Sequence, residues 1–283
     1  MLGGGYVAIT LAPALRSAIR AGELTATVVS RTNFQLFHGF TGEMLTGRVG
    51  PGNTLSPARR VFRPAGVHVA KIERIDVERK VVTTSRRLDG ARFELPYDHA
   101  VLALGTSDNF DAYPGLAEHS FKLKTFDDCF RLRNHIITML ELADIEDDPE
   151  ERGRLLTFFV AGGGFAGVEI AGELSDLIRV LTKREYASIR RDECRVVLVH
   201  PGKTILPELA GDGGHSRLIS FASRHLRKVG VEIMTDTRVA ATTPNEVYLQ
   251  NGVHVPTRTI VAAIGTKAPH CSTGCPCRGS AAA

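Results

Sequence analysis

The sequence predicts an α/β fold built from two similar domains, and three observations support this prediction. The chain has 283 residues, of which 43% are hydrophobic and 23% are charged, and this length and composition suit two globular domains. Strand-like runs rich in β-branched residues alternate with helix-like runs. Glycine-rich turns at residues 3–8 and 162–167 each lead into such a helix, so one structural unit is repeated along the chain.

Charge and composition narrow the functional classes. The formal net charge is +4, the pI is near 8.9 and no long run of Lys and Arg occurs, so nucleic-acid binding is not predicted. The basic excess suits either a groove for an anionic cofactor or an ordinary surface. No apolar run reaches the length of about 18 residues that a membrane span needs. The N-terminus lacks the features of a signal peptide, and the five cysteines suit a reduced compartment, so we expect a cytoplasmic protein.

The first unit begins directly at its turn. Residues 7–20 have the spacing of a helix, in which Pro13 is expected to be tolerated only in the first turns. Residues 24–30 are typical of a buried strand. Only Met1 and Leu2 stand where the strand before the turn is expected, and we therefore expect the start of the chain to be clipped.

The second unit is complete. Residues 155–161 form a continuous apolar strand, residues 168–181 form a helix, and residues 195–200 form the next strand. The acidic segment 144–151 is interpreted as a solvated link between the units. Elsewhere, helices are predicted at 126–143 and 221–229, and strands at 66–79, 80–84, 93–104, 231–234, 247–249, 253–255 and 259–264.

Both turns match the pattern G-x-G-x-x-G or G-x-G-x-x-A between a strand and a helix. The first glycine makes the turn, the second lets a diphosphate approach the backbone, and the third lets helix and strand pack closely. The helix N-terminus then presents its partial positive charge to the anion. One match alone can be a tight turn without a ligand, whereas two in the right context favour nucleotide binding. The matching residues are Gly162, Gly164 and Gly167 in the second unit and Gly3, Gly5 and Ala8 in the first.

The pattern also requires an acid at the end of the second strand, where it binds a ribose hydroxyl. The first unit ends instead in Ser30, followed by Arg31, and the second ends in His200. Ser30 can hydrogen-bond a hydroxyl, and His200 can do the same or favour a 2′-phosphate. The alternative is that these side chains only cap strand ends. The choice between NADH and NADPH therefore stays open.

Two such units with Ala103-Leu104-Gly105-Thr106 between them resemble the FAD/NAD(P)H pyridine nucleotide oxidoreductases, and most of all the type II NADH dehydrogenases (NADH:quinone oxidoreductases). The resemblance extends from residue 1 to about 267 and implies two Rossmann-like dinucleotide-binding domains. The segments that carry it are residues 33–38, 42–45, 102–109, 113–116, 122–125, 160–174 and 206–208.

The resemblance implies a domain order and a reaction. Residues 1–145 are expected to form the first part of an FAD domain, residues 146–255 an inserted NAD(P)H domain, residues 256–267 a return strand and residues 268–283 an irregular tail. Hydride is expected to pass from NADH or NADPH to the flavin, and electrons to a small acceptor such as a quinone. Neither a nucleic-acid partner nor a membrane anchor in this chain is expected, the complete protein would lie at the inner face of the membrane, and a homodimer is left open.

The resemblance also implies cofactor contacts. Ser30 and Arg31 would lie near the adenosine ribose of FAD, and Val69 would meet the adenine through its backbone. Gly105 and Thr106 would flank the flavin cofactor. The glycine positions of the first and second turns would hold the diphosphates of FAD and NAD(P)H, and His200 and Gly265 complete the set of expected cofactor contacts.

Two glutamates are the expected catalytic residues. Glu169 resembles the family's acid that faces the contact between nicotinamide and flavin. The alternative for Glu169 is an acid favoured only by the helix dipole. Glu173 lies one turn further on the same helix face and is the second choice.

The sequence departs from the family after Lys267. The Gly-Asp segment that completes the family's FAD domain and the quinone-side, membrane-anchoring segment have no match, so we expect an incomplete FAD domain and a clipped end. Cys271, Cys275 and Cys277 follow His270, a set that can ligate zinc. We expect no metal there, because the cluster is single and no regular element is predicted to hold it.

Two alternative functions stay open. One is a reductase of a protein electron carrier such as a ferredoxin, and the other is a truncated, weakly active or inactive nucleotide-binding remnant. A dithiol relay is disfavoured, because no cysteine precedes Cys129 and such a relay needs a close cysteine pair beside the flavin.

Overall fold

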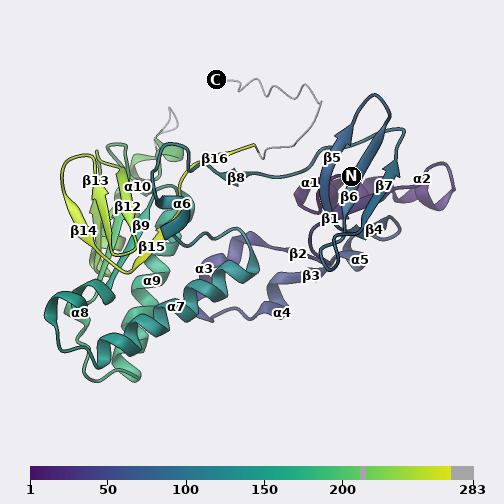
Figure 1. Ribbon diagram of the computed structural model, residues 1–283. Helices are drawn as coiled ribbons and strands as arrows, with labels where there is room; N and C mark the ends of the chain where they lie inside the picture. Colours follow the sequence, from purple (N-terminus) through teal and green to yellow (C-terminus); the bar gives the residue numbers. More distant parts are fainter. Residues whose placement is uncertain (211–214, 269–283) are drawn as a thin grey trace. The chain divides into compact units, whose positions relative to one another are not determined.

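A computed structural model describes residues 1–210 and 215–268, and the chain forms two compact units in it (Figure 1). Unit 1 contains Met1–Phe37, Gly52–Ser107 and the described residues from Lys267, and unit 2 contains His38–Pro51 and Asp108–Thr266. The cysteine cluster at 271–277 lies outside the described residues.

Unit 1 is built around a short parallel sheet next to a three-stranded antiparallel one. Strand β1 pairs in parallel with β4, and β5, β6 and β7 form an antiparallel sheet. The strands are β1 (Thr27–Ser30), β2 (Phe34–Leu36), β3 (Leu55–Pro57), β4 (Gly66–Val69), β5 (Lys71–Asp76), β6 (Val81–Ser85) and β7 (Arg92–Pro96), and the helices are α1 (Tyr6–Ala14), α2 (Arg16–Arg20) and α5 (Ala58–Val61). Helix α4 (Pro51–Thr54) and strands β8 (Ser107–Asp108) and β16 (Thr266–Lys267) lie where the chain passes from one unit to the other.

The first two residues take the place of the expected strand before the turn. Leu2 forms parallel bridges with both Val29 and Leu102. The Leu2 N–H donates to Val101 O and the Leu2 carbonyl accepts from Ala103 N, each at 2.8 Å. Leu2 is buried, so the parallel sheet continues through this short segment.

Neighbouring residues of β1 bury opposite faces of the sheet, as the two-residue period of a strand requires. Val28 packs in a cluster with Ala8, Ala12 and Phe62, and this cluster joins α1 and α5 to the sheet. Val29 packs with Leu2 and the antiparallel strands on the other face. Helix α1, which follows the first glycine turn, is thereby fixed against β1.

Unit 2 contains a four-stranded parallel sheet in the order β11-β10-β9-β15. The sheet strands are β9 (Thr157–Ala161), β10 (Arg195–Val199), β11 (Val231–Met234) and β15 (Thr259–Ala262). An antiparallel meander follows, made of β12 (Val239–Thr243), β13 (Glu246–Leu249) and β14 (His254–Pro256). The helices are α3 (Thr41–Thr46), α6 (Leu116–His119), α7 (Phe126–Asp144), α8 (Pro149–Leu155), α9 (Phe165–Arg184) and α10 (Ser216–Lys228).

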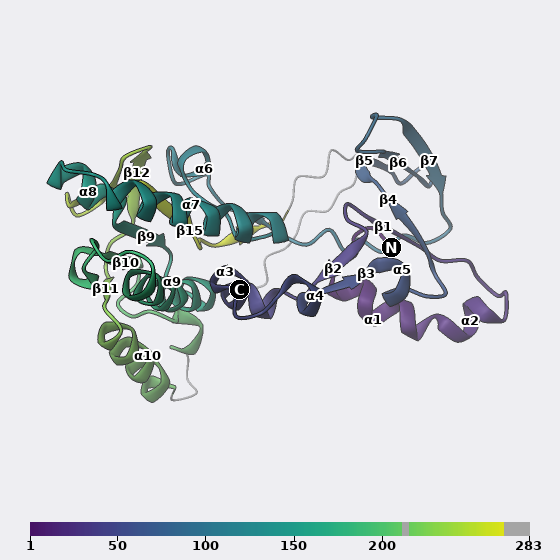
Figure 2. The same cartoon turned by 90° about the horizontal axis from the view of Figure 1, so that it is seen from below.

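The parallel sheet is covered on both faces, which explains the continuous apolar run of β9. Phe158 and Val160 pack with the helices α7, α9 and α10. Phe159 and Ala161 point the other way and pack with the meander. Figure 2 shows α10 and β12 on opposite sides of β10. The glycine turn after β9 therefore starts from a fully buried strand.

Segment 38–51 packs on the helices of unit 2. Leu45 is fully buried in the same core as α7 and α9, and Arg133 donates to Leu45 O at 2.8 Å. Residues 108–145 also belong to this compact unit, although the sequence analysis placed them with the first domain. The assignment of FAD and NAD(P)H to separate domains stays a prediction.

One expectation about local structure was wrong, and another was incomplete. Pro13 lies in the last turn of α1, just before the final helical residue Ala14, instead of in the first turns. Because proline has no N–H, the helical hydrogen bond to Ile9 O is not made there. The segment 144–151 is not only a link, because α8 begins at Pro149, with Asp148 accepting from Glu150 N as its N-cap.

Among the described residues, none of the helices combines the length and the apolar character needed to cross a membrane.

Candidate functional site

The turn between β9 and α9 is packed so tightly that its first and third glycines are required. Gly162 has φ +112°, and a Cβ there would lie 2.2 Å from Ala263 O. A Cβ on Gly167 would lie 1.7 Å from Gly162 O. Both contacts are with backbone atoms, which cannot move without moving the sheet. These two glycines therefore set the turn and the helix–strand packing, as the sequence predicted.

The second glycine meets a different requirement. Gly164 is the N-cap of α9 with φ −73°, which any residue adopts. A Cβ there would lie 2.7 Å from Oε1 of Glu208, the end of an exposed, flexible side chain. The backbone conformation at position 164 thus does not require glycine, but the missing side chain keeps open the space beside the first turn of α9. No side chain of the described residues caps this helix, so its first amides are free to bind an anion, and this cradle fits a diphosphate.

His200 lies at the same turn, directly after β10. The Gly163 N–H donates to Nδ1 of His200 at 3.2 Å, and the side chain is buried. Burial lowers the pKa of His200, and the negative charge of Glu208 partly offsets this. The imidazole is therefore neutral at pH 7 and supports the turn. Its contact with a ribose stays a prediction.

The turn in unit 1 repeats this geometry. Gly3 has φ +119°, and a Cβ there would lie 2.0 Å from Ala103 O. Gly5 is the N-cap of α1, and in the part of the chain that the structure describes, no side chain caps this helix and no atom lies within 4 Å of the Gly5 Cβ position. Ala8, in the third place, is fully buried. The first glycine of each turn thus has the same left-handed backbone. The Cβ position of the second glycine is open in unit 1 and faces only a movable side chain in unit 2.

Each glycine turn packs against a second segment, and these two segments share a four-residue sequence pattern. The sequence analysis did not predict this repetition. Residues 103–106 read Ala-Leu-Gly-Thr and residues 263–266 read Ala-Ile-Gly-Thr. In each, the alanine carbonyl lies against the first glycine of a turn. Gly105 and Gly265 have open space at their Cβ positions, and Thr106 is exposed, as suits residues that flank a ligand. The common four-residue pattern was the signal for this duplication.

Ser30, Arg31 and Val69 lie together at one edge of unit 1. Ser30 pairs with Val69 at the carboxyl ends of β1 and β4. Ser30 Oγ lies 2.6 Å from the Cβ position of Gly4 in the turn, and Arg31 follows as an exposed residue. The structure thus brings the expected ribose and adenine contacts next to the first turn, and their roles stay predictions.

The two candidate catalytic glutamates differ in their surroundings. Glu173 on α9 accepts a 2.8 Å ion-paired hydrogen bond from Arg48, and its Cγ lies 2.7 Å from the Cβ position of Gly42 on α3. Glu173 therefore helps to dock α3 on α9, a contact that the sequence did not reveal. Glu169 has no hydrogen bond or ion pair to the described residues and remains accessible.

Both glutamates are held in an acidic group with Glu43. The pKa of Glu169 is raised, first by desolvation and then by the charges of Glu43 and Glu173. The pKa of Glu173 is also raised, mainly by desolvation, although Arg48 opposes the shift. A helix dipole acting alone would lower the pKa of Glu169, so its neighbours outweigh the dipole. The catalytic role of either residue stays a prediction.

The raised pKa predicts a pH-dependent effect of Glu169→Gln on stability. The folded state disfavours the ionised carboxylate, so ionised Glu169 destabilises the protein above the ordinary carboxyl pKa of about 4.3. We expect Glu169→Gln to unfold at higher urea concentration than the wild type at pH 7. The difference should shrink as the pH falls and disappear well below the ordinary carboxyl pKa of about 4.3, where the carboxyl is protonated in both states. A variant less stable than the wild type at pH 7 would contradict this account.

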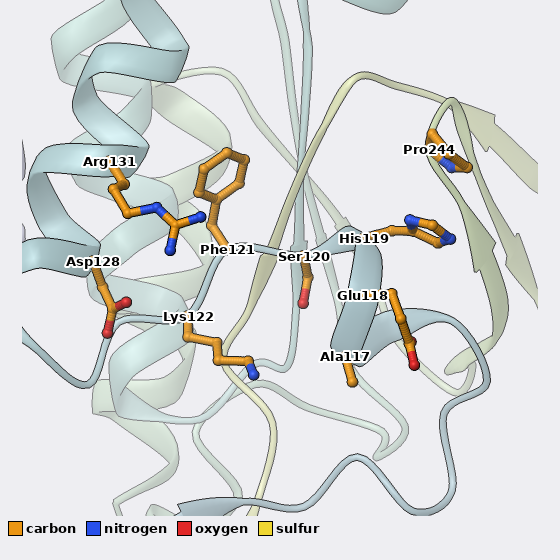
Figure 3. A pocket seen from close by; sticks show the side chains of 9 residues that line it. All are labelled: Ala117, Glu118, His119, Ser120, Phe121, Lys122, Asp128, Arg131 and Pro244. Carbon is orange, nitrogen blue, oxygen red and sulfur yellow. The ribbon is translucent and has the colours of Figure 1, made fainter. Parts of the chain in front are cut away.

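A separate pocket of about 370 Å³ lies between the end of α6 and the start of α7. Figure 3 shows His119 and Arg131 on opposite sides of it. Of its two acids, Glu118 and Asp128, Asp128 already accepts from the N–H groups of Lys124 and Thr125 as part of the helix cap. None of the predicted site residues lines it, so we do not assign the dinucleotide to this pocket.

The described cysteines are poor redox groups. Cys129 and Cys194 are buried, and burial raises the pKa of each thiol to about 11. Both are therefore protonated at neutral pH, whereas thiol chemistry needs the thiolate. Within residues 1–210 and 215–268, no three His, Cys, Asp or Glu side chains are placed to hold a metal ion.

Residues 1–281 match the family model described as pyridine nucleotide-disulphide oxidoreductase. The chain belongs to this family. The type II NADH:quinone oxidoreductase Ndh of Mycobacterium tuberculosis is 28% identical over 254 residues, which cover 89% of this chain and 52% of the relative. The mitochondrial external alternative NADH-ubiquinone oxidoreductase of Yarrowia lipolytica is 27% identical over 254 residues, covering 87% of this chain and 42% of the relative.

A solved structure confirms the predicted fold. NDH2 from Plasmodium falciparum, in complex with NADH, superposes with a TM-score of 0.85 at 19% identity, covering 95% of this chain and 55% of that chain. The α/β fold with two Rossmann-like units is therefore correct. The chain spans about half the length of the curated relatives that it matches.

Proposed function

We propose that this chain is the dinucleotide-binding part of an FAD-dependent NAD(P)H dehydrogenase that reduces a quinone. The observation that carries the proposal is the duplicated turn, in which Gly3 and Gly162 share a left-handed backbone and a carbonyl contact. In both units the second glycine leaves uncapped helix amides accessible. Two diphosphate cradles in one chain suit an enzyme that holds two dinucleotides.

The residues of the chain have distinct tasks in this proposal. The first amides of α1 would hold the diphosphate of FAD, and those of α9 would hold the diphosphate of NAD(P)H. Bound FAD would supply the two-electron redox chemistry that links the nicotinamide to the acceptor. Glu169, accessible and with a raised pKa, is the chain's candidate to exchange a proton with this chemistry.

A quinone is the favoured acceptor for two reasons. The relatives from M. tuberculosis and Y. lipolytica are named as quinone and ubiquinone oxidoreductases. The described thiols, with pKa values of about 11, do not suit a dithiol relay. Because ubiquinone-type acceptors dissolve in lipid, we propose that the complete protein lies at a membrane surface, and the resemblance to the type II NADH dehydrogenases favours the inner face.

The test is a redox titration of the purified full chain. After incubation with FAD and removal of the excess, we expect flavin absorbance near about 450 nm that bleaches on anaerobic addition of NAD(P)H and returns on addition of a water-soluble quinone. Gly5→Val should prevent flavin retention, because its side chain would enter the open space at α1. Gly153→Ala, in open space on α8, is the control that should behave as the wild type.

Other outcomes identify the other functions. A colourless protein that still binds NADH would indicate a nucleotide-binding remnant. Bleaching by NADH followed by reoxidation with a ferredoxin but not with any quinone would indicate a reductase of a protein carrier. A chain that binds neither FAD nor a nicotinamide dinucleotide would contradict the proposal.

A further inference from the structure

We propose that Glu208 supplies the ribose-binding acid that the end of β10 lacks, and that unit 2 thereby selects NADH over NADPH. This inference rests on the proposed function, in which unit 2 binds the nicotinamide dinucleotide. The residue after β10, where the acid is expected, is His200. The carboxylate comes instead from the loop eight positions further along the chain.

His200 is unavailable for selecting a 2′-phosphate. Its Nδ1 accepts the 3.2 Å hydrogen bond from Gly163 N, so the ring is held against the turn with its proton on Nε2. It is buried, and a Cβ on Gly163 would lie 2.9 Å from its Cβ. A neutral, buried imidazole in this position supports the turn but does not supply a positive charge.

Glu208 is brought to the turn by an anchored loop. Leu206 adopts a left-handed backbone with φ +55°, is buried, and donates from its N–H to Gly163 O at 2.7 Å. A single helical turn, η3 (Pro207–Leu209), follows immediately. This places Oε1 of Glu208 at 2.7 Å and Oε2 at 3.8 Å from the Cβ position of Gly164. The backbone that carries Glu208 is thus anchored to the turn, while the side chain itself stays exposed.

The chemistry of this position discriminates between the two cofactors. A carboxylate accepts hydrogen bonds from the 2′- and 3′-hydroxyls of the adenosine ribose in NADH. In NADPH the 2′-oxygen carries a phosphate with negative charge, which the carboxylate repels. Lys203, an exposed cation in the same loop, provides the opposite hypothesis, in which a lysine binds that phosphate.

The test is calorimetric titration of the full chain with NADH and NADPH. The wild type should bind NADH more tightly, and Glu208→Gln should weaken NADH binding by about tenfold, the effect of a lost charged hydrogen bond. NADPH binding should stay unchanged or become tighter in this variant. The matched control is Glu185→Gln, which removes the same charge at the other end of α9, about 30 Å away, and should leave both affinities unchanged.

Three results would overturn the inference. Tighter NADH binding by Glu208→Gln would mean that the carboxylate opposes the diphosphate instead of binding the ribose. An unchanged ratio of the two affinities would remove Glu208 from selectivity. A wild type that prefers NADPH, with that preference lost in Lys203→Ala, would assign the loop to a 2′-phosphate. If the wild type bound neither dinucleotide, the proposed function would fail together with this inference. In each of the other three results a dinucleotide still binds, so only the inference about Glu208 fails.

Discussion

Gly167→Ala should destabilise unit 2 by about 3 kcal/mol or more, an effect at the upper end of overpacking. The new methyl group would lie 1.7 Å from Gly162 O. That carbonyl cannot retreat, because Gly162 is itself packed against Ala263 O. Relief would require α9 to move away from β9, which would expose the buried core between them. Urea unfolding followed by circular dichroism measures the loss.

The matched control for this variant is Gly172→Ala in the same helix. A Cβ on Gly172 meets only Leu226 Cδ2, at an ordinary 3.6 Å. This change should stabilise the protein by about 0.5–1 kcal/mol, because alanine is the better helix former. If Gly167→Ala lowers the free energy of unfolding and Gly172→Ala raises it, the turn, and not the helix, requires Gly167. Equal stabilities of Gly167→Ala and the wild type would contradict the packing described for this turn.

Gly164→Ala should weaken NADH binding strongly without unfolding the protein. Its backbone suits any residue, and its Cβ would meet only the movable end of Glu208, so we expect a stability cost below about 1 kcal/mol. The methyl group would occupy the space through which the diphosphate reaches the amides of α9. Loss of these charge-assisted hydrogen bonds should weaken binding at least about tenfold.

Calorimetry with NADH and urea unfolding of the same samples separate the two effects of Gly164→Ala. Gly153→Ala repeats the substitution on α8, where nothing lies within 4 Å of the Cβ position, and should keep full affinity. If Gly164→Ala bound NADH as the wild type does, the turn would not be the diphosphate site.

Local patterns in the sequence predicted much of the fold. The apolar run that contains β9 and the glycine spacing after it are consequences of one buried strand and one tight turn, so neighbouring residues are sufficient to predict them. The start of α8 was equally local, since Asp148 and Pro149 are typical of a helix N-terminus. It was missed because the acidic composition of the segment was given more weight than these two residues.

The remaining features depend on contacts between residues far apart in the sequence. The ion pair of Arg48 with Glu173 joins residues 125 positions apart, and no periodicity along the chain indicates it. Likewise, the sequence pattern places the ribose-binding acid at the end of the second strand, and in this chain that position is occupied by His200. Glu208 reaches the turn only because Leu206 bends the loop back onto Gly163.

A crystal structure of the full chain with NADH would show directly where the diphosphate binds. We expect the diphosphate about 3 Å from the backbone amides at the start of α9, over Gly164, with the adenosine ribose beside Glu208. A dinucleotide bound elsewhere, such as in the pocket between α6 and α7, with the turn at 162–167 covered by protein atoms, would contradict it.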